Sequence, residues 1–269
     1  MVTIWRRVSD DDGVKPSFES LTIFFPMWNE EALIGQTVAA ALDAAEDLVV
    51  AGEIGRYEIL IIDDASTDRT PQMADALAEA DNNVRVVHHP VNRKLGGSLK
   101  TGFAEARGEL VLYTDADLPF DMAELAKAVR IMRLYEADIV SAYRFDRTGE
   151  GPRRFVYSYI YNTLVRYGFA LRLRDVNFAF KLVHRRVLDH VELKSEGSFI
   201  DVELLARANR LGFHTVQFGV DYFPRSRGVS TLSSGSVIVK ILREMGRLYK
   251  ELRTIEPLDE IDRHPPASA

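Results

Sequence analysis

The sequence contains no cysteine in its 269 residues, which excludes disulfide bonds, thiolate metal sites and cysteine nucleophiles. It also lacks a run of about 18 apolar residues, the length that a membrane-spanning helix needs. Positive charge is not in excess, because 34 Lys and Arg residues stand against 40 Asp and Glu residues and leave a net charge of -6. Overall electrostatics therefore give no indication of nucleic-acid binding. These absences leave a protein that is soluble or lies on a membrane surface.

The composition is that of an ordinary globular protein, with 46% apolar and 28% charged residues. Short apolar runs alternate with longer helical patterns through the first half of the chain. This alternation predicts a doubly wound, Rossmann-like α/β sheet with helices on both faces. The expected strands of this half are residues 21–25, 57–62, 84–87, 110–114 and 138–142.

The second half of the chain is less regular. Its pattern predicts strands at 175–183 and 214–220 and a helix at 198–211. The expected organisation is a flexible tail (1–19), a single folded domain (20–234), an amphipathic helix that would suit a membrane surface (235–253) and a disordered tail (254–269).

Asp115 and Asp117 stand one residue apart where the apolar run 110–112 ends, so both carboxylates would lie on one exposed turn. Such a turn suits a hard divalent cation, Mg2+ or Mn2+, which takes oxygen ligands and keeps positions open for phosphate oxygens. Taken alone, the motif is more typical of a turn that only ends a strand and caps the next helix. Two further polar clusters, at 28–30 and 63–64, follow other expected strands, and parallel strands bring their carboxyl ends to one edge of a sheet. Because close carboxylates repel one another unless a cation lies among them, the three clusters together favour a ligand site.

Three motifs in this half are similar to those of a known family. They are Phe-Pro-Met-Trp-Asn-Glu at 25–30, Ile-Asp-Asp-Ala-Ser-Thr-Asp at 62–68 and Asp-Ala-Asp at 115–117. The chain resembles the inverting family 2 glycosyltransferases, which have the GT-A fold. Within the family it looks most like the dolichyl- or polyprenyl-phosphate hexose synthases for mannose or glucose.

Four stretches of the second half carry this narrower resemblance: 141–144, 175–181, 197–204 and 225–230. The chain departs from the synthases at two places. Pro119 stands where many of them have Gln, and Asn177-Phe-Ala stands where they usually have Thr-Ser-Gly.

The resemblance implies roles on the donor side of a site. Asp64 would accept a hydrogen bond from the nucleotide base, and Trp28 would stack on the base or ribose. Asp117 would bind the metal, with Asp115 on the metal or the ribose. Further contacts with the donor nucleotide sugar, GDP-mannose or UDP-glucose, are implied for Pro26, Glu30, Lys94, Gly97 and Ala116.

On the acceptor side, a lipid phosphate is already an anionic nucleophile, so it needs positive groups and no general base. Arg144 is expected at the donor diphosphate, where positive charge stabilises the leaving group. The candidates for binding the acceptor phosphate are Arg174, Lys181, Arg225, Arg227 and Ser230. The expected catalytic set is Asp117, Arg144, Arg225 and Arg227, and inversion would give a β-linked hexosyl phosphate.

Other functions stay open on the sequence alone. Transfer to a soluble or glycan hydroxyl would need a general base, for which Asp201 or Glu203 is the candidate. A nucleotidyltransferase can also use an acidic metal site in an α/β sheet, although no Gly-rich triphosphate loop follows the first expected strand. A binding module without catalysis is disfavoured because Asp64, Asp115, Asp117 and Arg144 occur together.

The expected location follows from the acceptor and from two surface segments. The aromatic and arginine-rich stretch 153–174 and the helix near 235–252 would both suit an anionic membrane. We therefore expect a cytoplasmic protein, peripheral at the inner face of the cytoplasmic membrane, with a nucleotide sugar and a polyprenyl phosphate as partners. The sequence predicts no oligomeric state.

Overall fold

A mixed sheet with the strand order β3-β2-β1-β4-β6-β5-β7 forms the centre of the protein. The computed structural model describes residues 16–145, 163, 165–222 and 235–263, and in the last range it describes side chains from residue 243 onward. The strands are β1 (Phe18–Met27), β2 (Ile54–Asp63), β3 (Val84–His88), β4 (Leu110–Thr114), β5 (Ile139–Arg144), β6 (Phe180–His184) and β7 (Thr215–Val220). The helices are α1 (Ile34–Val50), α2 (Thr70–Ala80), α3 (Lys94–Glu105), α4 (Glu124–Leu134), α6 (Arg185–Leu188), α7 (Ile200–Leu211), α8 (Gly235–Thr254) and α9 (Glu260–Arg263).

The first four strands in the chain are parallel, as their alternation with helices predicted. β1 lies between β2 and β4 and runs parallel to both. β6 then runs antiparallel between β4 and β5, while β5 and β7 are parallel again. The doubly wound α/β sheet expected from the sequence is therefore confirmed, and the antiparallel β6 makes it a mixed sheet.

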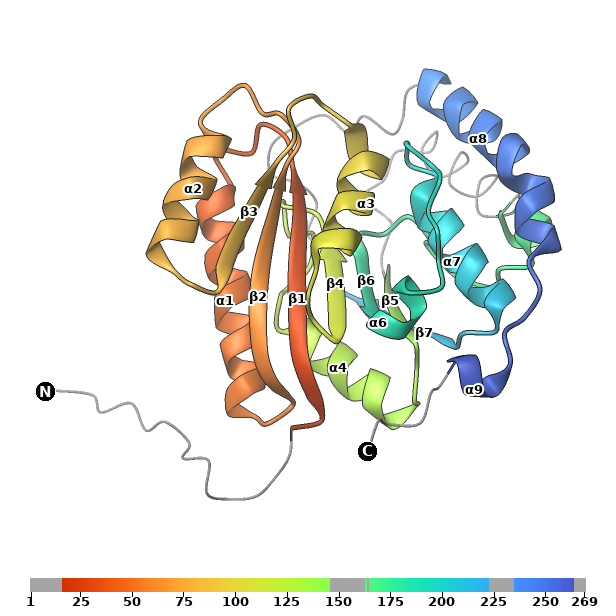
Figure 1. Cartoon of the computed structure of the whole chain (residues 1–269), viewed down its shortest axis with the longest axis horizontal. Helices are drawn as coiled ribbons and strands as arrows, with labels where there is room; N and C mark the ends of the chain where they lie inside the picture. Colours follow the sequence, from red (N-terminus) through yellow and green to blue (C-terminus); the bar gives the residue numbers. More distant parts are fainter. Residues whose placement is uncertain (1–15, 146–162, 164, 223–234, 264–269) are drawn as a thin grey trace, which may run out of the picture.

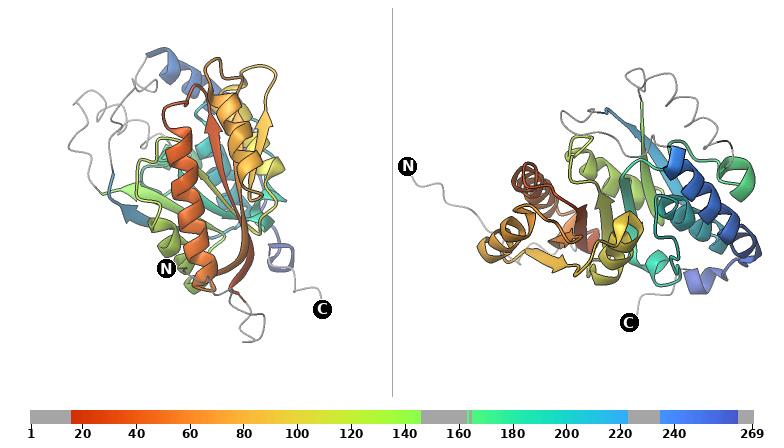
Figure 2. Two further views of the ribbon diagram at one scale, coloured as in Figure 1. Left: turned by 90° about the vertical axis from the view of Figure 1, so that its left-hand side faces the viewer. Right: turned by 90° about the horizontal axis from the view of Figure 1, so that it is seen from above.

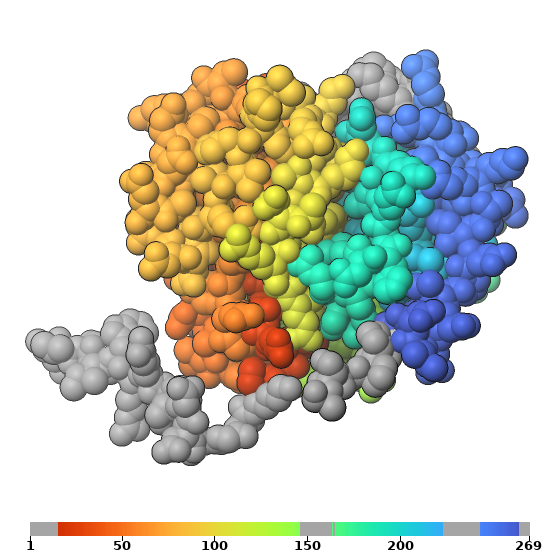
Figure 3. Space-filling model, in the orientation of Figure 1, coloured from red at the N-terminus to blue at the C-terminus, as the bar shows by residue number. Residues whose placement is uncertain are grey.

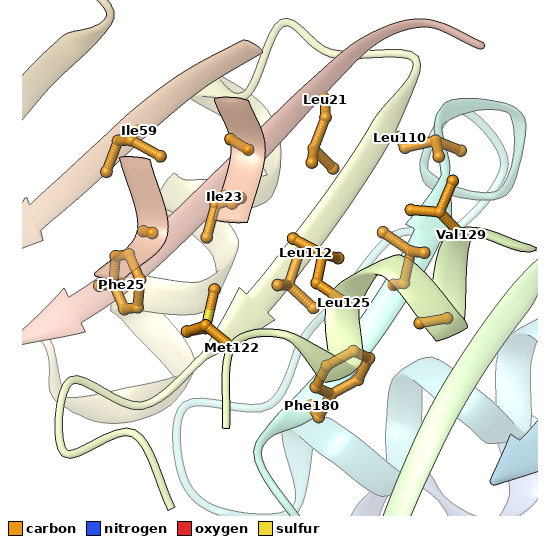
Figure 4. Packing of buried hydrophobic residues seen from close by; sticks show 14 of the residues in the cluster. Leu21, Ile23, Phe25, Ile59, Leu110, Leu112, Met122, Leu125, Val129 and Phe180 are labelled. Carbon is orange, nitrogen blue, oxygen red and sulfur yellow. The ribbon is translucent and has the colours of Figure 1, made fainter. Parts of the chain in front are cut away.

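Helices cover both faces of this sheet (Figures 1 and 2). α1, α2 and α4 pack on one face, and α3, α7 and α8 pack on the other. The first hydrophobic core lies between the sheet and α1, α2 and α4, and the second lies between the sheet and α3, α7 and α8. Alternate residues of β1 point to opposite faces, so Ile23 and Phe25 lie in the first core and Phe24 lies in the second. Figure 4 shows the first core, in which Phe25 and Ile23 lie near Met122 and Leu112. Burial of these apolar side chains is the main force that holds the layers together.

The residues 194–197 lie between α3 and α8 on the face shown in Figure 3. The Gly96 N–H donates to the Glu196 carbonyl oxygen (3.1 Å), and the Ser195 hydroxyl donates to Glu244 of α8 (2.8 Å). A Cβ at Gly96 would overlap the Glu196 backbone, so this close approach requires glycine. The segment thereby ties the two helices to one another.

Two sequence-based expectations about secondary structure are wrong. The strand expected at 175–183 begins only at Phe180, because Asp175 has a φ of 45° and opens a turn. The tail expected to be disordered contains α9, and the Leu258 N–H donates to the Leu211 carbonyl oxygen (3.1 Å). Leu258 also packs against the second core, which accounts for the order of this segment.

The first tail is also shorter than expected, because β1 begins at Phe18, whose N–H donates to the Glu53 carbonyl oxygen (3.1 Å). In α8, Leu248 and Leu252 are buried, whereas Arg247 and Lys250 are exposed. Within the part of the chain that the structure describes, no helix is both long enough and apolar enough to cross a membrane.

Candidate active site

The loops that follow β1, β2 and β4 meet at one edge of the sheet, the upper edge in Figure 1. The first two loops are joined by hydrogen bonds. Asn29 donates its N–H to the Ser66 hydroxyl (2.9 Å) and accepts from the Thr67 N–H (2.7 Å). The Glu30 N–H donates to the Thr70 hydroxyl (2.8 Å). Two of the polar clusters seen in the sequence therefore form one structural unit.

Asp64, the residue expected to bind the base, is almost completely buried and is held by the loop between β3 and α3. Its Oδ1 lies 2.7 Å from Nδ1 of His89 and accepts from the Arg93 N–H, also at 2.7 Å. Nε2 of His89 lies 2.9 Å from the Thr101 hydroxyl. Asp64 is thus fixed in one orientation by this loop, and Thr101 of α3 in turn holds His89.

Asp63 is held by the neighbouring histidine. Nδ1 of His88 lies 2.8 Å from Oδ2 of Asp63, and its Nε2 lies 3.1 Å from Oδ1 of Asp75. Sequence reasoning missed both histidines, although two consecutive histidines at the end of a strand were the available signal. Partial burial opposes the charged form of His88, but the hydrogen bonds to Asp63 and Asp75 outweigh it and raise the pKa of the imidazole.

We expect the stabilisation by His88 to depend on pH. Because its folded-state pKa is raised, the stabilisation is complete below the unfolded pKa of about 6.5 and is lost as the pH rises through the folded-state pKa. His88→Ala should therefore lower the free energy of unfolding more at about pH 5.5 than at about pH 8.5. Urea unfolding of both proteins at the two pH values measures this difference. An equal loss at both values would contradict the ion pairs.

The turn that carries Asp115 and Asp117 is anchored by its backbone. The Thr37 hydroxyl donates to the Ala116 carbonyl oxygen, and the Leu118 N–H donates to the Asp115 carbonyl oxygen (3.3 Å). Ala116 is buried in the first core, as is Phe120 just after the turn. Asp115 and Asp117 themselves remain partly exposed. Both carboxylates therefore stand on a rigid turn at the sheet edge.

Tyr113 lies directly beneath this turn and is buried. Burial, followed by the negative charges of Asp201 and Asp115, raises the pKa of Tyr113 well above its usual value. Its hydroxyl is hydrogen-bonded to Asp115. Since an ionised carboxylate can only accept, the tyrosine donates and so orients Asp115.

The carboxylates of the turn fit a metal that is shared with a phosphorylated ligand. Among the residues that the structure describes, no group of three His, Asp or Glu side chains could hold a metal ion. Asp115 and Asp117 nevertheless offer hard oxygen ligands of the kind that Mg2+ and Mn2+ prefer. Diphosphate oxygens and water would have to complete the coordination sphere.

Arg144 is held by Asp175 in a two-pronged ion pair. Its Nε donates to Oδ2 of Asp175 (2.7 Å) and its Nη2 donates to Oδ1 (2.9 Å). The guanidinium also lies 5.0 Å from the ring centre of Tyr222. Planar pairing with a carboxylate and an aromatic neighbour fixes the guanidinium plane, so Arg144 is positioned before any ligand binds.

Lys181 is fully buried, with 0% of its side chain exposed, and forms a 3.1 Å ion pair with Asp201. Its ammonium also donates to the Phe178 carbonyl oxygen (2.6 Å). Burial raises the pKa of Asp201, and Lys181 opposes that shift. The expected role of Lys181 as a phosphate ligand does not fit this position, because both polar contacts lie inside the protein.

Glu203 is buried as well and has a structural role. Its carboxylate accepts from the Ser195 N–H (2.7 Å) and from Nε of Arg207 (2.9 Å). Asp201 is engaged by Lys181, so each general-base candidate is occupied by partners within the protein. This arrangement argues against either carboxylate as a base for a hydroxyl acceptor.

The remaining expected residues lie in different settings. Trp28 is 56% exposed at the sheet edge, and Pro26 lies within β1. Lys94 begins α3 with a φ of 59°, and Gly97 is buried in the first turn of that helix. Arg174 is exposed, with its guanidinium 5.3 Å from the ring centre of Tyr143. Arg225, Arg227 and Ser230 lie outside the described residues, as does half of the stretch 153–174.

Comparison with known families matches residues 22–192 to the model described as Glycosyl transferase family 2. The chain belongs to glycosyl transferase family 2. This membership confirms the resemblance that the motifs predicted, and it decides against a nucleotidyltransferase.

Several curated proteins are similar to this family member. Glycosyltransferase AglD of Haloferax volcanii is 33% identical over 210 residues, which are 76% of this chain and 33% of that protein. Undecaprenyl-phosphate 4-deoxy-4-formamido-L-arabinose transferase of Pseudomonas aeruginosa is 29% identical, over 80% of this chain and 60% of that protein. The chain thus spans between about a third and three fifths of the length of these two relatives. Polyprenol monophosphomannose synthase of Mycolicibacterium smegmatis is 29% identical, over 85% of this chain and 86% of that protein.

Solved structures support the fold. Glucosyl-3-phosphoglycerate synthase from Mycobacterium tuberculosis, in complex with phosphoglyceric acid, has a TM-score of 0.63 at 22% identity and covers 85% of this chain and 80% of that one. Mannosyltransferase PcManGT from Pyrobaculum calidifontis, in complex with GDP-Man and Mn2+, has a TM-score of 0.61 at 18% identity. The match covers 90% of this chain and 71% of that one. These similarities confirm the GT-A arrangement of the sheet.

Proposed function

We propose that this family 2 glycosyltransferase moves a hexose from a nucleotide sugar to a polyprenyl phosphate, with inversion and with a divalent metal. The observation that carries the proposal is the anchored acidic turn 115–117 on the same sheet edge as the buried carboxylate of Asp64. The names of two relatives, one an undecaprenyl-phosphate transferase and one a polyprenol monophosphomannose synthase, support the acceptor class.

Asp64 and the acidic turn supply the donor side of the proposed site. Asp64 accepts from the nucleotide base, and Trp28 offers an exposed indole for stacking. Asp117 and Asp115 hold Mg2+ or Mn2+, which when bound would neutralise the charge of the diphosphate leaving group. Tyr113 fixes the orientation of Asp115 through its hydrogen bond.

The chemistry of a phosphate acceptor agrees with the occupied carboxylates. A phosphate oxygen attacks the anomeric carbon, the bond from that carbon to the diphosphate breaks, and the nucleoside diphosphate leaves with the bonding electrons. No proton has to be removed from such a nucleophile. The reaction therefore needs no general base, which agrees with the pairing of Asp201 and Glu203 inside the protein.

The surface of the C-terminal half supports placement on a membrane. α8 exposes Arg243, Arg247, Lys250 and Arg253. Tyr167, which belongs to the aromatic and arginine-rich stretch 153–174, is 81% exposed. Basic side chains are attracted to anionic lipids, and aromatic ones favour the headgroup region. We propose that this surface lies on the inner face of the cytoplasmic membrane, where a polyprenyl phosphate is accessible.

A panel of donors and acceptors tests the proposal. The chain is incubated with Mn2+ or Mg2+, with GDP-mannose or UDP-glucose, and with polyprenyl phosphate, polyprenol or no lipid. We expect release of nucleoside diphosphate with one donor, and only in the presence of both metal and polyprenyl phosphate. Equal release with the unphosphorylated polyprenol would contradict the phosphate acceptor, because the two lipids differ only in that group.

A further inference from the structure

We propose that the buried chain Thr101–His89–Asp64 determines the base of the donor and selects uridine over guanosine nucleotides. This inference rests on the proposed function, since it takes Asp64 as the group that meets the base. It adds a positioning residue, His89, and a substrate class to that site.

The hydrogen bonds around Asp64 define which of its oxygens is available. A carboxylate only accepts, so Nδ1 of His89 carries the proton that it shares with Oδ1 of Asp64. The Arg93 N–H donates to the same oxygen, and each of the two distances is 2.7 Å. Oδ1 is therefore saturated by two donors. Among the described residues, no hydrogen bond reaches Oδ2.

His89 is itself held in place from the other side. In the neutral ring, protonation at Nδ1 leaves Nε2 as an acceptor, and the Thr101 hydroxyl lies 2.9 Å from it. His89 and Asp64 are 6% and 4% exposed, so water does not compete strongly for these bonds. The chain joins the end of β2 to α3 and prevents the carboxylate from rotating.

A carboxylate that offers one oxygen distinguishes between bases by the number of donors they present. Uracil presents a single ring N–H between two carbonyl groups, and one oxygen satisfies it. Guanine presents a ring N–H beside an exocyclic amino group, and this pair matches both oxygens of a carboxylate. With Oδ1 saturated, one of the guanine donors would lose its hydration without gaining a charged partner, which costs affinity.

Calorimetric titration with UDP and GDP in the presence of Mn2+ tests the inference, because the two ligands differ only in the base. We expect the wild-type protein to bind UDP at least about tenfold more tightly than GDP, the difference that one charged hydrogen bond provides. His89→Ala should weaken UDP binding about tenfold and bring the two dissociation constants close together. In turnover assays the same variant should raise KM for the donor while leaving kcat nearly unchanged.

Two further variants separate positioning from a general loss of packing. His89→Asn keeps an N–H donor near the place of Nδ1 and should restore part of the preference for UDP. His88→Ala removes a ring from the adjacent residue, whose partners are Asp63 and Asp75, and should leave the UDP-to-GDP ratio unchanged. Thermal unfolding of each variant confirms that it is folded.

The outcomes are distinct. Equal or tighter binding of GDP by the wild-type protein, or an unchanged ratio in His89→Ala, would overturn the inference and leave the proposed transferase function standing. Binding of neither nucleotide by the folded wild-type protein would overturn the proposed function, and the inference with it.

Discussion

Replacing Asp117 with alanine is expected to lower turnover by about 10³-fold or more, because the charge stabilisation that a metal provides is worth several kcal/mol. The fold should survive. The turn is anchored through the backbone oxygen of Ala116 and through the buried side chain of Phe120, and neither contact involves the carboxylate of Asp117. Initial rates of nucleoside diphosphate release, with saturating donor, metal and acceptor, measure the effect.

A matched control for this change is Asp47→Ala. Asp47 is an exposed acid on α1, so its removal makes the same change in charge and composition at a surface position. This variant should keep wild-type turnover. Wild-type turnover by Asp117→Ala itself, with donor and metal in excess, would show that the turn does not hold the metal.

Replacing Lys181 with methionine is expected to lower the free energy of unfolding by about 3–5 kcal/mol. Lys181 is fully buried, and its removal leaves Asp201 without the cation that compensates its charge. Methionine has a similar length and apolar character, so the loss of packing should be small. Urea unfolding at neutral pH measures the change.

The double variant Lys181→Met with Asp201→Leu separates the ion pair from the packing. Because it replaces both charges with apolar groups, it should recover most of the stability that the single variant loses. A single variant as stable as the wild-type protein would contradict a buried pair. Such a result would reopen the earlier expectation that Lys181 is free to bind phosphate.

Local patterns in the sequence were sufficient to predict the α/β architecture and the edge of the sheet at which the candidate site lies. The apolar runs expected at 21–25, 57–62 and 110–114 became β1, β2 and β4, since their spacing and composition favour buried parallel strands. Parallel strands place their carboxyl ends at one edge of a sheet. Because Asp64, Asp115 and Asp117 each follow such a strand directly in the sequence, their position on one edge could be predicted. The turn at Asp175 was missed because its conformation depends on a bond to Arg144, 31 residues away.

Only the tertiary structure decided which of these polar side chains are available. β6 enters antiparallel beside β4 and sets Lys181 opposite Tyr113, where the lysine meets Asp201 of α7. The loop after β3 likewise brings His89 onto Asp64. The sequence by itself determined the succession of strands along the chain and the placement of the acids at their ends, because these follow from local periodicity. The pairing of charges required the fold, because burial makes an unpartnered charge costly and the partner comes from a distant part of the chain.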